Sequence, residues 1–185
     1  MMSPTHIAAG VVIATPLTVL APELAPTVAL AAMAGGVFPD LDLFAGEHRK
    51  TLHFPVYYWG LVLPAGVLAA ASPSMATIAA FFFFLSAAVH SVADWFCGGN
   101  ELRPWENTSQ HAVFVHPLGR WLPPKRLVRW DGSPEDLLLT VLLSLPGLVL
   151  FSGPVRTLTA ATLVVAVVYA AVRKRVPDLA PWLAE

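Results

Sequence analysis

The chain has 185 residues, of which 56% are apolar and only 12% are charged, and its formal net charge is −1. Soluble proteins have about 25% charged residues, so this composition, with a mean hydropathy of +0.66, excludes an ordinary soluble domain and a disordered chain. The balance of charges argues against a nucleic-acid-binding protein, and the single cysteine excludes an intramolecular disulfide and a cysteine-rich zinc module. We therefore expect a membrane protein.

The apolar residues form six runs, and these predict six helices. The first two runs, 7–20 and 27–38, are short, and we interpret them as a pair of short helices. A cleaved signal peptide is the alternative for the first run, but a signal peptide begins with a positive segment and residues 1–6 contain no Lys or Arg. The run at 75–96 is long enough to span a bilayer. The other runs cover 54–71, 137–151 and 155–172.

Residues at the ends of these runs supply helix signals. Ser3 and Ser133 each precede a proline, which predicts two helix starts with Ser as the N-cap and Pro in the first turn. Pro16, Pro64 and Pro146 lie inside apolar runs, where we expect them to kink the helices. The sequence therefore predicts an all-α fold, a polytopic membrane helical bundle of about six helices in three hairpins.

We expect a single membrane-embedded domain over residues 1–185. Its first part, 1–99, carries the candidate site, 98–134 is a polar cytoplasmic excursion, and 135–174 is a C-terminal hairpin. The excursion mixes basic and aromatic residues, which is typical of the lipid headgroup region. A loop that only sets the orientation of the protein is the alternative.

The basic residues gather on one side of the predicted bundle. If the six helices alternate in direction, that side carries the N-terminus, the segments 39–53 and 98–134, and the C-terminal tail. It holds ten of the eleven Lys and Arg residues, whereas Arg156 alone lies on the other side. Cytoplasmic loops are enriched in these residues. We therefore expect a multi-pass protein of the cell (inner or plasma) membrane with both termini in the cytoplasm.

Histidines and aspartates gather on the same side. His90 and Asp94 are four residues apart, so they share one face at the end of a helix. Ionisable groups inside a span indicate function, although this pair could also only tie two helices together. Asp40 and Asp42 follow the second run in a turn that we expect not to be helical, where both carboxylates can face one cation. A helix end in water is the alternative for these two aspartates.

Two more histidines complete the set of candidate ligands. His6 begins the first predicted helix and His53 begins the third, so four helix ends can deliver imidazoles and carboxylates to one layer. A mixed His/Asp set suits a divalent metal, with Zn²⁺ favoured and Mn²⁺ or Mg²⁺ as alternatives. Six ligands leave room for two ions. The candidates are His6, Asp40, Asp42, His53, His90 and Asp94.

The order and spacing of these residues resemble those of the YdjM-like family. The matching segments, within residues 3–99, are 5–10, 38–42, His48-Arg49 with His53, and 90–94 followed by Gly98. Members are multi-pass inner-membrane proteins assigned as metal-dependent hydrolases, some under LexA control. The resemblance implies metal-binding roles for the six candidate ligands. The chain departs from the family pattern at Lys50, where a small residue is common, and at Phe54, where Ser is common, which leaves the substrate open.

These observations favour a membrane-bound metal-dependent hydrolase. The metal would lower the pKa of a bound water to about 7 and polarise the scissile group. Arg49 could stabilise negative charge on a phosphate, although a solvated basic loop is the alternative, and Asp94 is the second candidate catalytic residue. The expected substrate is a phosphate ester or a lipid-linked phosphate, such as a phospholipid, at the cytoplasmic face. The lipid bilayer is the expected partner, and we expect no nucleic acid.

Two other functions would use the same residues. A metal or proton transporter needs polar groups through the whole membrane depth, and the last two predicted helices hold almost none, which disfavours it. A scaffold would use the His/Asp residues only to staple the bundle together. The sequence assigns no role to His48, His111 and His116.

Overall fold

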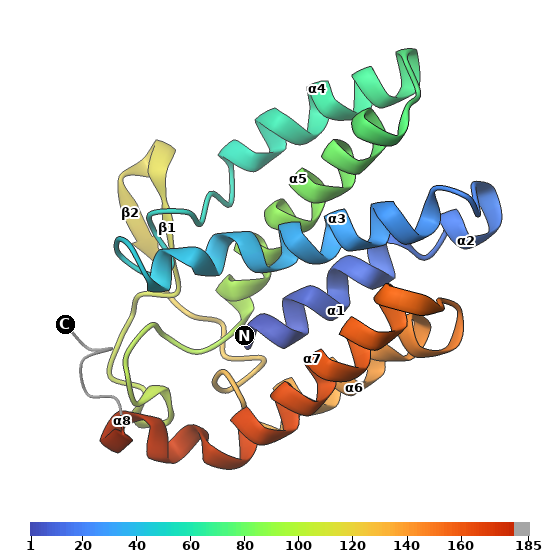
Figure 1. Cartoon of the computed structure of the whole chain (residues 1–185). Helices are drawn as coiled ribbons and strands as arrows, with labels where there is room; N and C mark the ends of the chain where they lie inside the picture. The colour runs from blue at the N-terminus through green and yellow to red at the C-terminus, as the bar shows by residue number, and fades with distance from the viewer. Residues whose placement is uncertain (180–185) are drawn as a thin grey trace.

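The computed structural model describes residues 1–179, and most of them are helical (Figure 1). Six helices of 12 to 20 residues account for the bulk of the fold, which confirms the prediction of an all-α bundle of six helices. Each long helix corresponds to one apolar run of the sequence. The six are α1 (Ser3–Ala14), α3 (Ala25–Val37), α4 (Tyr57–Ala71), α5 (Met75–Ala93), α6 (Pro134–Val149) and α7 (Gly153–Val172).

Short elements connect and extend the long helices. Pro16 lies between α1 and the four-residue helix α2, so this proline ends a helix, whereas Pro64 and Pro146 lie inside α4 and α6. The segment 98–134 contains a small antiparallel sheet, which departs from the predicted polar loop. The short elements are α2 (Leu17–Leu20), η1 (Phe38–Leu43), η2 (Asp94–Phe96), η3 (Pro104–Glu106), β1 (Val113–Val115), η4 (His116–Leu118), β2 (Arg120–Leu122), η5 (Arg173–Arg175) and α8 (Val176–Leu179).

Three segments are long and apolar enough to cross a membrane, namely Ser3–Leu20, Met75–Phe96 and Gly153–Leu179. The helix α4 is also apolar but shorter. Large apolar side chains on these helices are exposed, as at Leu63 and Val67, which are each 69% exposed. Exposed apolar surface on this scale is stable where lipid covers it. The fold is therefore that of a membrane protein.

The connecting elements divide between the two ends of the bundle (Figure 1). One end holds α2 and the tight turns that join α4 to α5 and α6 to α7. The other end holds the N-terminus, η1, the sheet and α8. The central helix α1 packs against α3, α5, α6 and α7, whereas α4 packs chiefly against α5. Residues near the start of α1 therefore lie among the elements of this second end, which we call the polar end.

Two glycines of α3 allow its neighbours to approach closely. A Cβ atom at Gly36 would lie 2.5 Å from the carbonyl oxygen of His6, and one at Gly35 would overlap the carbonyl group of Phe83. Larger residues at these positions would push α1 and α5 away from α3. The close approach lets the rings of His6 and His90 stack, with their centroids 3.5 Å apart.

Only one of the two predicted serine caps is present. Ser133 is the N-cap of α6, and its side chain accepts a hydrogen bond from the backbone of Asp136. The prediction for Ser3 is wrong, because Met2 is the N-cap of α1 and the Ser3 hydroxyl donates to Asp40 (2.5 Å). Asp136 of α6 accepts from the Met2 backbone N–H (2.8 Å) and from Thr5 Oγ1 (2.7 Å). A distant side chain therefore holds the start of α1.

The expectation that the last two helices hold almost no polar groups is also wrong. Asp136, Thr140 and Ser144 recur every four residues along α6 and are fully buried. The leucines between them hide this spacing in the composition of the run. Thr140 and Ser144 each donate to a carbonyl one turn earlier, at 2.8 and 2.7 Å, which is how hydroxyls inside helices are usually satisfied.

Candidate metal centre

Four of the six candidate ligands converge at the polar end of the bundle. Their ligand atoms lie within 4.8 Å of one another, and all four side chains are buried. One comes from η1, one from the loop before α4, one from the last turn of α5 and one from η2. We call this set the His/Asp cluster: Asp40, His53, His90 and Asp94.

The two histidines of the cluster point their Nε2 atoms toward each other, and in the neutral rings these nitrogens are bare, that is, unprotonated. His90 Nδ1 lies 2.6 Å from the carbonyl oxygen of Gly36, which can only accept, so this nitrogen carries the proton. His53 Nδ1 lies 2.8 Å from a carboxylate oxygen of Asp42 and donates to it in the same way. In the neutral rings, both Nε2 atoms are then acceptors, and they are only 3.1 Å apart. A cation between them would remove this repulsion.

Carboxylate oxygens complete the same group of acceptors. Asp40 Oδ1 lies 3.3 Å from His90 Nε2 and 3.6 Å from His53 Nε2. Asp94 Oδ2 lies 3.3 Å from His53 Nε2 and 3.7 Å from His90 Nε2. A tetrahedral Zn²⁺ site with bonds of about 2.0–2.1 Å has ligands about 3.3–3.4 Å apart. The donor types and their spacing therefore fit one divalent ion.

In the metal-free protein a proton can take the place of that ion. Burial opposes a charge on His53, but the surrounding carboxylates of Asp40, Asp42 and Asp94 outweigh it and raise the pKa of His53 to about 10. The imidazole is therefore protonated at neutral pH unless a metal displaces the proton. The cluster requires positive charge at its centre in either state.

Asp42 lies behind His53 rather than inside the cluster. The segment 38–43 is a 3₁₀ helix, so the expectation of a non-helical turn is wrong. This geometry sends the two aspartates of η1 to opposite nitrogens of His53, with Asp42 on Nδ1 and Asp40 on Nε2. Hydrogen bonds from His48 and His53 overcome the effect of burial and lower the pKa of Asp42 to about 2. Asp42, His48 and His53 form a second group that could hold a metal ion.

His6 also lies at the edge of the cluster. Its Nε2 is 3.1 Å from Asp94 Oδ1, whereas the other oxygen of that carboxylate faces His53 and His90. The Met1 amino group donates to the same Oδ1 at 2.6 Å. His6 therefore contacts the cluster through Asp94 and through stacking on His90.

Arg49 is buried next to the cluster in a strained conformation. Its φ of +63° lies in the left-handed region, which costs of order 1–3 kcal/mol for a residue other than glycine. Contacts with the 98–134 segment hold it there, because Nη1 donates to the carbonyl of Gly98 (2.6 Å) and its own carbonyl accepts from Phe114 (3.0 Å). Arg49 Nε is 3.5 Å from Asp94 Oδ2 and has no hydrogen-bond partner among the residues described. A buried N–H is thus left for another acceptor.

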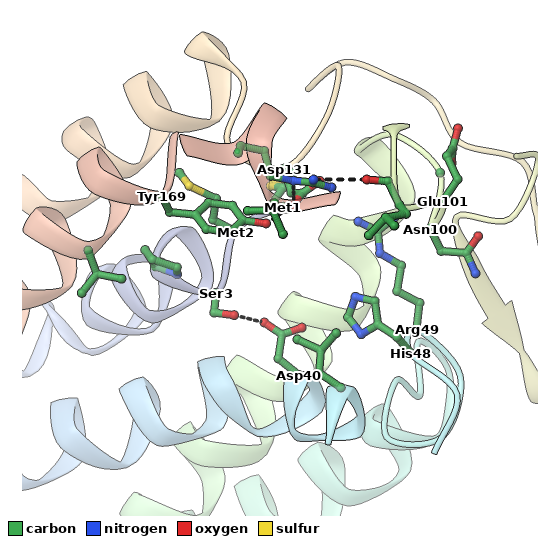
Figure 2. A pocket seen from close by; sticks show the side chains of 17 residues that line it. Met1, Met2, Ser3, Asp40, His48, Arg49, Asn100, Glu101, Asp131 and Tyr169 are labelled. Carbon is green, nitrogen blue, oxygen red and sulfur yellow. Dashed lines mark hydrogen bonds and ion pairs between the residues drawn. The ribbon is translucent and has the colours of Figure 1, made fainter. Parts of the chain in front are cut away.

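A cavity of about 350 Å³ lies beside the cluster. Figure 2 shows Ser3 pointing at Asp40, with His48 and Arg49 on one side of the cavity and Tyr169 on the other. Asp40 belongs both to the cavity wall and to the His/Asp cluster. A molecule in the cavity would therefore contact Arg49 and one ligand of the proposed ion together.

Some residues of the site were not found from the sequence. Ser3 was assigned as a cap, and His48 received no role, although it hydrogen-bonds Asp42 at 2.8 Å. His111 and His116 lie away from the cluster: His111 stacks on Trp121, and His116 packs against Phe54. His48 lies next to Arg49 and six residues after Asp42, and this spacing indicates that it belongs to the site.

The fold and the site together define a class, a helical membrane protein with a buried His/Asp cluster that could hold a metal ion. Comparisons with protein-family models, with curated proteins and with solved structures found no match for this chain. The class therefore rests on the fold and on the geometry of the site.

Proposed function

We propose that the chain is a membrane-bound metal-dependent hydrolase, as its resemblance to the YdjM-like family implies, and that its substrates are phosphate esters. The observation that carries the proposal is the convergence of two bare imidazole nitrogens and two carboxylate oxygens beside a cavity that Arg49 lines. Buried acceptors in this arrangement are unfavourable without a cation. They are well suited to holding one next to a substrate.

The residues of the His/Asp cluster would hold the ion, with Zn²⁺ favoured by the mixed nitrogen and oxygen donors and Mn²⁺ or Mg²⁺ as alternatives. A bound divalent ion supplies a Lewis acid and a water molecule of lowered pKa. Asp42 fixes the ring of His53 through Nδ1, as carboxylates commonly do for metal-binding histidines. His6 acts similarly on Asp94 through Oδ1.

Arg49 supports a phosphate ester as the substrate. Burial opposes its charge, but Asp94 more than compensates and raises the pKa of the guanidinium, so Arg49 stays charged. Arg49 lines the cavity, and guanidinium groups bind phosphates well. In the reaction, a water oxygen attacks phosphorus, the bond from phosphorus to the ester oxygen breaks, and the alcohol leaves after taking up a proton. The products are the alcohol and inorganic phosphate or a phosphomonoester.

We also propose that the polar end of the bundle faces the cytoplasm, in the cell (inner or plasma) membrane. The ten-to-one distribution of Lys and Arg supports this orientation. Single cysteines on a Cys97→Ser background test it by labelling from either side. A cysteine at Ser74 should react from outside and one at Gln110 from the cytoplasm, and the reverse pattern would overturn the orientation.

The alternative function is that of a non-enzymatic metal or proton transporter. The buried polar side chains of α6, which are Asp136, Thr140 and Ser144, favour a transporter more than the sequence alone does. However, Thr140 and Ser144 already donate to carbonyls of their own helix, and Thr159 of α7 does the same. These hydroxyls therefore have hydrogen-bond partners within their own helices, and the hydrolase is favoured.

Metal analysis and phosphate release test the proposal. Purified protein in detergent should bind about one Zn²⁺ or Mn²⁺ per chain and release phosphate from a soluble aryl phosphate. His90→Ala should lose most of the metal and at least about 100-fold in rate, because it removes one of the four ligands. His111→Ala is the matched control, since His111 lies away from the cluster, and it should keep both properties. Metal binding without hydrolysis of soluble or lipid phosphates would exclude the enzyme.

A further inference from the structure

One wall of the cavity is a single face of the C-terminal helices. Val165, Tyr169, Arg173 and Val176 line the cavity and recur every three or four residues, so they lie on one side of α7 and its extension. Polarity changes along this face. Val165 is apolar, whereas Tyr169 and Arg173 both hydrogen-bond Asp131. Val165 lies four residues before Tyr169 and eight before Arg173, so these two polar residues are about 6 and about 12 Å from it along the helix axis.

The apolar part of the cavity reaches the surface that faces lipid. Val165 is 57% exposed and belongs to a segment long and apolar enough to span a membrane. Leu43 of η1 also lines the cavity and is 45% exposed. Leu102 contributes a third apolar side chain from the loop after α5. The cavity therefore opens toward hydrocarbon at one end.

The polar part of the same cavity lies at the His/Asp cluster. Arg49, which is 3% exposed, lines it and has a buried Nε–H without a partner among residues 1–179. An anion at this point would lie beside the Arg49 guanidinium and next to Asp40, whose negative charge an ion held by the cluster would offset. A ligand that fills the cavity thus needs an anionic group at one end and an apolar chain at the other.

We propose that this cavity binds a lipid phosphate, a phosphate ester whose hydrocarbon chain lies against Val165 and Leu43 while its phosphate faces Arg49. The lipid enters sideways from the bilayer, so it does not have to leave the membrane. This inference rests on the proposed function for the fate of the lipid, but the binding itself is independent of any reaction. The order of residues on α7 fits this arrangement, because Val165 lies about two turns before Arg173 and so farther from the polar end of the helix.

Photo-crosslinking tests the binding without relying on catalysis. The probe is phosphatidic acid with a diazirine in one acyl chain, at a low level in phosphatidylcholine nanodiscs that hold the full-length chain. Cross-links should fall on peptides containing Val165, Leu43 or Leu102. Unlabelled phosphatidic acid should displace the probe, whereas extra phosphatidylcholine and soluble glycerol phosphate should not at the same concentration.

A matched pair of variants locates the chain in the cavity. Val165→Trp fills the apolar end and should lower cross-linking at least 10-fold. Val164→Trp is the control, because Val164 is 63% exposed but lines a separate apolar groove on α7. Should Val165→Trp fail to fold, Leu43→Trp on the opposite wall replaces it, with Leu41→Trp, also at a 45% exposed position, as its control. Equal cross-linking in both members of a pair would overturn the proposal.

The remaining outcomes separate this inference from the proposed function. Displacement by phosphatidylcholine would mean that the cavity takes any lipid, and displacement by glycerol phosphate would mean that the chain is not recognised. Either result overturns the lipid phosphate site. Specific cross-linking without phosphate release supports the site and rejects the hydrolase. Release of phosphate from soluble esters without specific cross-linking does the opposite.

Discussion

Two buried ionic clusters lie at the same end of the bundle, and they differ in how their charges are balanced. In the first, Arg173 binds Asp131 through two nitrogens, at 2.6 and 3.1 Å, and Tyr169 donates to the same carboxylate. Each acceptor there meets a donor, and the pair has the parallel geometry that makes arginine–carboxylate bonds strong. In the His/Asp cluster, two imidazole Nε2 atoms and two carboxylates converge instead, and only a proton on His53 or a bound ion keeps acceptors from facing one another. Burial alone therefore does not indicate a metal site, whereas unbalanced acceptors do.

The largest expected effect breaks the balanced cluster. Arg173→Met should lower the free energy of unfolding by about 3 kcal/mol, because it leaves the Asp131 carboxylate without its cation in a largely buried position. The loss should be the same with and without Zn²⁺, since no residue of the His/Asp cluster changes. Thermal unfolding in detergent measures both states. A loss seen only in the metal-bound protein would show that the two clusters are coupled.

The next effect concerns the unbalanced cluster. Asp94→Asn keeps the side-chain volume and removes the charge, so metal affinity should fall at least about 100-fold, or about 2.7 kcal/mol. The metal-free protein should also lose some stability, because the Asp94 carboxylate pairs with the Met1 amino group and with Arg49, but the loss should be clearly larger in the metal-bound state. Four melting curves, for wild type and variant with and without metal, decide between a ligand and a staple. Equal destabilisation in both metal states would exclude the ligand role.

The smallest effect is a dependence on pH that only the unbalanced cluster should show. The pKa of His53 is raised to about 10 from 6.5, so its proton stabilises the metal-free fold fully below about pH 6.5, and that contribution is lost as the pH rises through 10. Metal binding must displace this proton, so affinity should rise about tenfold per pH unit between pH 7 and 9. Calorimetric titration in buffers of different ionisation enthalpy measures the released proton. A flat affinity over this range would contradict the assignment.

Much of the fold could be predicted because its signals are local. Apolar runs and the turns between them are read from neighbouring residues, and they predict six helices, although the first run extends to residue 20 whereas α1 ends at Ala14. The residues of the cluster could be named for a similar reason, since His and Asp are rare and costly in apolar segments. The four-residue spacing of His90 and Asp94 also placed them on one helical face.

The arrangement of the site could not be predicted, because it depends on contacts between distant segments. Asp40 and Asp42 are chemically alike, and only the 3₁₀ geometry of η1 sends them to opposite sides of His53. Ser3 has the composition of a cap, but packing of α1 against η1 brings its hydroxyl to Asp40. Likewise the left-handed backbone of Arg49 follows from its contacts with residues about 50 and 65 positions away.

The hydrogen bonds of Asp136 have a consequence for biosynthesis. The ribosome makes α1 first and α6 more than a hundred residues later, yet the start of α1, next to His6, is held by Asp136. Until the last hairpin has entered the membrane, the Met2 N–H and the Thr5 hydroxyl lack this partner. The start of α1 therefore gains these hydrogen bonds only after nearly the whole chain has been made. Nascent chains that stop before α6 would carry all the ligands without their final support.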